Sequence, residues 1–120
     1  MNAHLLAQGL YAASAAPVRT PRAVEYDLLS RVTRALRQAH DFAALATALH
    51  ENRRLWTTLS ADVAEPGNGL PRELRARLYY LSEFTAHHSR RILSGNGDVS
   101  VLVEINTAVM RGLAGRGGDT

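Results

Sequence analysis

The sequence contains no cysteine and no lysine, and it has no long apolar run. The absence of cysteine excludes disulfide scaffolds, zinc knuckles and thiol chemistry, so stability must come from packing. No run of about 18 apolar residues is present to cross a bilayer, and the N-terminus lacks the basic segment and apolar core of a signal peptide. We therefore expect a cytoplasmic location and no membrane partner.

The remaining composition is that of one globular domain. The chain has 120 residues, of which 46% are hydrophobic and 21% charged, which is too apolar for a disordered tail. All 14 basic residues are arginine, and the net charge of +3 is compatible with an acidic partner. Acidic residues are interspersed with the arginines, however, and no dense basic stripe or RNA-binding motif accompanies them. We therefore expect no nucleic-acid partner.

Apolar residues recur at helical spacing in one short and four long segments. The short helix covers Leu5–Ala15, and Gly9 together with many alanines makes it weakly anchored. The long helices are predicted from Pro21 to about Ala39, between Asp41 and Glu65, from Pro71 to before Gly95, and over Val99–Leu113. Because the connections are short, neighbouring helices should be antiparallel. The predicted fold is all-α: a small bundle of four main helices plus a weakly anchored N-terminal helix. Residues 1–113 form its single domain, and the Gly-rich residues 114–120 form a disordered tail.

Residues that start or stop helices mark the predicted boundaries. Thr20 before Pro21 is typical of an N-cap followed by the first helical position. Asp41 and Asp98 are expected to cap the third and last helices. The cluster Glu65-Pro66-Gly67-Asn68-Gly69 predicts a loop, after which Pro71 restarts a helix.

One apolar stripe on each long helix predicts the core. On the helix from Pro21 it contains Leu28, Leu29, Val32, Ala35, Leu36 and Ala39. On the helix after Asp41 it contains Phe42, Leu45, Leu49, Asn52, Trp56, Leu59 and Val63. On the helix after Pro71 it contains Leu74, Leu78, Leu81, Thr85, His88 and Ile92. On the last helix it contains Val99, Leu102, Val103, Asn106, Val109, Met110 and Leu113.

Two asparagines lie inside these apolar stripes. Asn52 and Asn106 are expected to be buried, where each must find a hydrogen-bond partner and thereby specify helix register. They could pair with each other or bind backbone groups, because a buried unsatisfied amide costs roughly 1–3 kcal/mol. Trp56, one turn beyond Asn52, is expected to be a core residue; the alternative is an anchor that contacts a partner.

No catalytic, cofactor or metal site is predicted. His50-Glu51 lacks the second histidine that a zinc protease motif requires. His87 and His88 are adjacent on a helix and therefore point about 100° apart, which is poor geometry for one ion. The sequence has no nucleophile elbow, phosphate-binding loop or cofactor fingerprint. We therefore expect a protein that is not an enzyme.

A partner-binding surface is predicted from aromatic residues outside the core stripe. Tyr79, Tyr80 and Phe84 lie off the line of Leu74, Leu78 and Leu81, so part of an aromatic patch should reach the surface. Such a patch suits helix-in-groove binding. The apolar side of the N-terminal helix, formed by Leu5, Leu6 and Leu10, is expected either to cover this patch or to form part of the binding groove.

An ordered set of short motifs resembles the FlaF family, small flagellar biosynthesis regulators of alphaproteobacteria. The motifs run in order from Tyr11 through Pro21-Arg22, Glu25-Tyr26, Asn52-Arg53-Arg54-Leu55-Trp56, Asn68-Gly69-Leu70-Pro71, Glu104-Ile105-Asn106 and Met110-Arg111-Gly112-Leu113. The resemblance covers almost the whole chain. It implies a non-enzymatic role in flagellin production, opposite the translational regulator FlbT.

Two mechanisms are compatible with this resemblance. One is a chaperone that binds flagellin in the cytosol and holds its terminal helices, which form coiled coils and would aggregate if left free. The other is regulation of flagellin mRNA translation, either directly or through FlbT. We expect the chaperone, with flagellin as the partner.

Overall fold

Four helices make up the described part of the computed structural model, which covers residues 21–118 for the backbone and 25–112 for the side chains. They are α2 (Pro21–Gln38), α3 (Phe42–Ala64), α4 (Arg72–Leu93) and α5 (Val99–Gly118). No strand occurs among these residues, so the predicted all-α class is confirmed. The helix predicted over Leu5–Ala15 lies outside the described residues. Within residues 21–118 no helix combines the length and the apolarity needed to span a bilayer.

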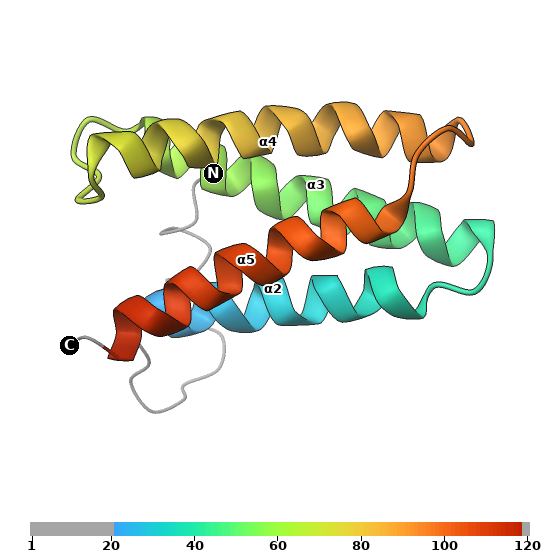
Figure 1. Cartoon of the computed structure of the whole chain (residues 1–120), viewed down its shortest axis with the longest axis horizontal. Helices are drawn as coiled ribbons and strands as arrows, with labels where there is room; N and C mark the ends of the chain where they lie inside the picture. Colours follow the sequence, from blue (N-terminus) through green and yellow to red (C-terminus); the bar gives the residue numbers. More distant parts are fainter. Residues whose placement is uncertain (1–20, 119–120) are drawn as a thin grey trace.

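The helices run alternately in opposite directions, as the short loops predict. Figure 1 shows α4 along the top with α3 behind it, and α5 lying across α2 below. The closest packing is between α2 and α5 and between α3 and α4, whereas α4 and α5 contact each other little. From the loop of residues 94–98, α5 diverges from α4 toward its C-terminal end (Figure 1). One side of the bundle is therefore more open than the other three.

Helix ends follow the predicted chemistry. The side chain of Asp41 accepts a hydrogen bond of 2.8 Å from the backbone N–H of Ala44, which caps α3. Pro71 is the N-cap residue of α4, and its carbonyl oxygen accepts the first helical hydrogen bond, from Arg75. After α4, Gly95 has a φ of 87°, a left-handed conformation that favours glycine.

Asp98 caps α5, and its titration should make stability depend on pH. The Asp98 Oδ1 accepts a hydrogen bond of 2.9 Å from the Ser100 backbone N–H. This bond is the main cause of a pKa below the ordinary range of the carboxyl. Because the pKa is lowered in the folded state, the cap contributes its full stability above about pH 4. That contribution is lost as the pH falls through the lowered pKa.

Asp98→Asn, which cannot titrate, should lose less free energy of unfolding than the parent chain between pH 6 and pH 3. Urea unfolding at the two pH values measures this loss, and an equal loss would contradict the role of Asp98.

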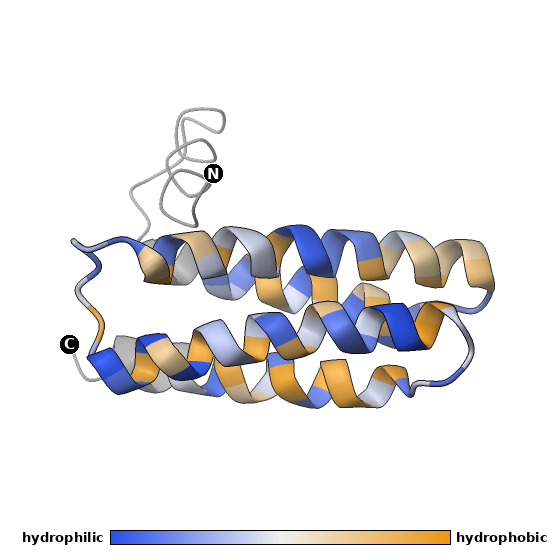
Figure 2. Cartoon of the chain, turned by 90° about the horizontal axis from the view of Figure 1, so that it is seen from above, coloured by the Kyte–Doolittle hydropathy of each residue, from blue (hydrophilic) through white to orange (hydrophobic). Residues whose placement is uncertain are grey.

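The core consists of two clusters along the bundle. One contains Leu29, Leu55, Trp56 and Leu59. The other contains Leu36, Ala48, Leu49, Ile92 and Leu102. Figure 2 shows apolar and polar residues alternating around each helix, as expected for helices with one buried face.

Two predictions about the core were wrong, and the last helix ends later than predicted. Phe42 is 64% exposed, because it is the first residue of α3 and lies beside the loop rather than inside the bundle. Ala35 is exposed, because the buried line of α2 instead runs through Leu29, Thr33 and Leu36. Thr33 tolerates this burial because its hydroxyl donates to the Leu29 carbonyl at 2.6 Å.

The third difference is the end of α5. The helix continues to Gly118, past the predicted end at Leu113. Residues 114–118 therefore have a helical backbone, although a disordered tail was predicted to begin there. The segment contains no proline to stop the helix, and each added residue makes one further backbone hydrogen bond.

Candidate functional site

A chain of buried polar side chains joins α3 to α5. The Trp56 indole Nε1–H donates to Asn106 Oδ1 at 2.9 Å, and Asn106 Nδ2 donates to Asn52 Oδ1 at 2.8 Å. All three residues are at most 1% exposed. Of the two predicted pairings, the asparagines therefore bind each other, and Trp56 is a core residue rather than a surface anchor. Because every member is enclosed, the chain fixes helix register and is not a site for a ligand.

An apolar opening lies at the end of the bundle near the loop of residues 65–71. It has a volume of about 530 Å³. Its walls are apolar or small side chains from α4 and α5: Leu74, Leu78, Leu81, Ala108, Val109 and Gly112. We call this opening the α4–α5 groove. Core residues Leu29 and Leu59 lie at its base, and Glu25 and Arg77 are among its polar lining. The divergence of α5 from α4 leaves this side of the core accessible.

Sequence reasoning missed the α4–α5 groove because it assigned Leu74, Leu78 and Leu81 to the closed core. The structure leaves these three side chains partly exposed. The available signal was the pair Ala108 and Gly112, one turn apart on α5. Two small side chains on one helix face leave space that a larger pair would fill.

The predicted aromatic patch is divided between two faces. Tyr79 is 49% exposed and lines a pocket of about 370 Å³ between α3 and α4. Tyr80 is 66% exposed and Phe84 is partly buried, with its ring stacked on His88 at a centroid distance of 5.5 Å. Adjacent residues on a helix point about 100° apart, which separates Tyr79 from Tyr80. Exposure of part of the patch is confirmed. The other predicted partner-binding residues, Leu5, Leu6 and Leu10, lie outside the described residues.

Phe84 shares a helix face with two residues of the α4–α5 groove but does not line the groove. Residues 77, 81, 84 and 88 follow one another at steps of four, three and four, which is the spacing of one helix face. Arg77 and Leu81 line the groove, so Phe84 comes next along the same face of α4. Tyr79, Tyr80 and Phe84 themselves are not among the residues that line the groove.

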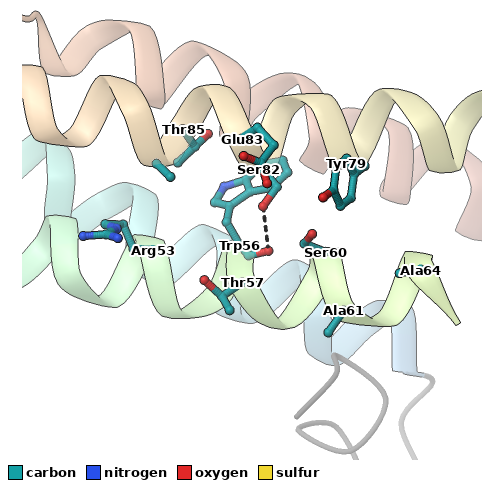
Figure 3. A pocket seen from close by; sticks show the side chains of 11 residues that line it. Arg53, Trp56, Thr57, Ser60, Ala61, Ala64, Tyr79, Ser82, Glu83 and Thr85 are labelled. Atoms are coloured by element: carbon teal, nitrogen blue, oxygen red, sulfur yellow. Dashed lines mark hydrogen bonds between the residues drawn. The ribbon is translucent and has the colours of Figure 1, made fainter.

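The pocket between α3 and α4 is smaller than the α4–α5 groove, and polar residues such as Ser60, Ser82 and Thr85 are among its lining. Figure 3 shows Ser82 of α4 beside Trp56 of α3, where the Ser82 hydroxyl donates to the Trp56 carbonyl at 3.2 Å. Arg53 and Glu83 also line this pocket. A hydrogen bond across its base and charged side chains around it make it a helix–helix contact rather than an apolar binding surface.

The two adjacent histidines have different environments. His87 is exposed, whereas His88 is buried and its Nε2 lies 3.0 Å from the Asp98 carbonyl oxygen. His88 thus links α4 to the start of α5. Among residues 25–112, no group of three histidine, cysteine, aspartate or glutamate side chains is placed to hold a metal ion.

Comparison with known families identifies the chain. The family model described as flagellar protein FlaF matches residues 7–113. The chain belongs to the FlaF family. The match includes all of α2, α3 and α4 and the described side chains of α5, and it begins 14 residues before α2. Searches of curated proteins and of solved structures each found no match. Family membership makes this a flagellar protein.

Proposed function

We propose that this FlaF-family protein is a non-enzymatic chaperone that binds a helix of flagellin in the cytoplasm and supports flagellin synthesis and secretion. Family membership supports the flagellar role. The observation that supports helix binding is the α4–α5 groove, an apolar opening bounded by two helices. Amphipathic helices bind such grooves by inserting apolar side chains at steps of three and four. The family resemblance implies that flagellin's terminal helices have this character.

The groove fits this role better than the other surfaces do. Leu74, Leu78 and Leu81 offer partly exposed apolar area, which a partner helix would remove from water. Arg77 at the groove offers a charged group that can set the orientation of the partner. Burial of apolar side chains with a charged contact at the edge is the usual composition of a protein interface.

Filling the groove should prevent flagellin binding. A Cβ added at Gly112 meets nothing within 4 Å, so Gly112→Phe should place its ring in the groove without displacing the core. Copurification with coexpressed flagellin after nuclease treatment should succeed for the parent chain, and the affinity of Gly112→Phe should be roughly tenfold lower or worse. Gly112→Ala is the matched control, because it also replaces glycine with a residue of higher helix propensity but leaves the groove open.

The outcomes separate the chaperone from the alternative. Equal flagellin binding by Gly112→Phe and Gly112→Ala would show that the groove is not the site. Loss of the complex on nuclease treatment would instead favour regulation of flagellin mRNA translation, directly or with FlbT. In that case a selective mRNA complex should weaken steeply with salt. The exposed arginines of α2, Arg31, Arg34 and Arg37, would then be the first residues to test.

A further inference from the structure

The base of the α4–α5 groove reaches the core of the bundle. Leu29 is fully buried and Leu59 is 7% exposed, yet both line the opening. Leu78 and Val109, on opposite walls, are only partly buried. Three sides of the bundle are closed by helix packing, whereas the fourth side is open at the groove. A further apolar helix here would complete the core as well as cover a surface.

The chain enters the described structure beside this groove. Glu25 lines the groove, and α2 begins one turn earlier at Pro21. A connection of five residues, 16–20, can span at most about 17 Å. Residues 5–15 are thus tethered close to the opening. Most of this segment cannot reach the distant end of the bundle, near the loop of residues 94–98.

Residues 5–15 also have the apolar character that binding in the groove requires. Leu6, Leu10 and Ala13 recur at steps of four and three, so they would share one face if the segment is helical. The segment carries no Asp, Glu, Lys or Arg that would be buried on docking. The family match begins at residue 7, so most of the segment belongs to the FlaF domain itself.

We propose that residues 5–15 bind in the α4–α5 groove of their own chain as a helix, with Leu6 and Leu10 inserted between the walls. The segment thereby closes the bundle in the absence of a partner. The role of this segment in flagellin binding rests on the proposed function. If flagellin binds in the same groove, it must displace residues 5–15, so this segment sets the affinity for flagellin. Intramolecular tethering raises its effective concentration at the groove without requiring strong contacts.

A spin label tests this proposal without any partner. The chain has no native cysteine, so Ser14→Cys can be labelled with a nitroxide at a single position. In the full-length labelled protein, the amide signals of Leu78 and Val109 should be lost from the two-dimensional spectrum. The signal of the exposed His50, more than two helical turns beyond Leu59 along α3, should be retained.

Three controls make the result specific. Adding Leu10→Glu to the labelled chain should restore the lost signals, and adding Gly112→Phe should do the same, whereas Gly112→Ala should not. Retained signals of Leu78 and Val109 in the parent chain would overturn the proposal. Loss of these signals from isotope-enriched chains without a label, after mixing with labelled chains that are not enriched, would also overturn it, because the occupant would then be the segment of a second copy.

Flagellin affinity then tests the regulatory part separately. Deleting residues 1–15 should tighten flagellin binding if the segment competes for the groove. Weaker binding after the deletion would show that the segment forms part of the flagellin site, and this outcome overturns competition even if the spin label confirms docking. Absence of flagellin binding by every form would contradict the proposed function while leaving the spin-label result unaffected.

Discussion

Asn106→Leu is expected to destabilise the fold by roughly 2–6 kcal/mol, because it leaves two buried polar groups unpaired at about 1–3 kcal/mol each. Those groups are the Trp56 Nε1–H and the Asn52 Oδ1, which both bind Asn106. Leucine has the branched shape of asparagine and a larger volume, so the change opens no cavity, although its extra bulk can add to the loss. Urea unfolding gives the change in the free energy of unfolding.

Asn52→Leu should be much milder. It leaves only Asn106 Nδ2 unpaired, and it removes the Asn52 Nδ2 group, which is buried without a hydrogen-bond partner. The double variant Asn52→Leu/Asn106→Leu should be more stable than Asn106→Leu alone, because only the indole N–H then remains unpaired. A double variant less stable than Asn106→Leu would show that Asn52 stabilises the fold through apolar contacts instead of through this hydrogen bond.

Leu102→Ala is expected to cost about 2–5 kcal/mol, because it opens a cavity in a closely packed part of the core. Leu102 is fully buried on α5 and packs in the cluster that contains Leu36, Leu49 and Ile92. A loss of this size is a large fraction of the 5–15 kcal/mol that is typical of a domain. Thermal and urea unfolding should both show the loss.

Leu93→Ala provides the control for the same chemical change on a surface residue. Leu93 is 38% exposed at the end of α4, so the variant should lose far less stability than Leu102→Ala. Similar losses for the two variants would mean that α5 is not firmly packed against α2. That result would also weaken the case for a rigid α5 wall of the groove.

The buried polar chain and the α4–α5 groove together explain how a small bundle can have both a fixed helix register and an open surface. The polar chain of Trp56, Asn106 and Asn52 holds α5 against α3 at one level of the bundle. Beyond it, toward its C-terminal end, α5 diverges from α4 (Figure 1). Register is thus set by directional hydrogen bonds inside the core, and the proposed binding site lies on the side where helix packing is incomplete.

The sequence by itself determined the helices and most of their ends. Local chemistry decides these features: Asp41 and Asp98 cap with their own side chains, and Gly95 takes a conformation that other residues avoid. The periodicity of three and four also predicted the burial of Trp56, Asn52 and Asn106, because a residue central to an apolar stripe faces the other helices whatever their order.

Only the tertiary structure decided which side of the bundle stays open. Leu74, Leu78 and Leu81 have the spacing of a core stripe, and nothing local distinguishes a stripe that meets a partner helix from one that borders a groove. That difference depends on the angle at which α5 crosses the bundle, which is set by the packing of α5 on α2 and by the hydrogen bonds of Asn106 to α3. The same holds for the pairing of Asn52 with Asn106, because residues 54 positions apart meet only through the arrangement of whole helices.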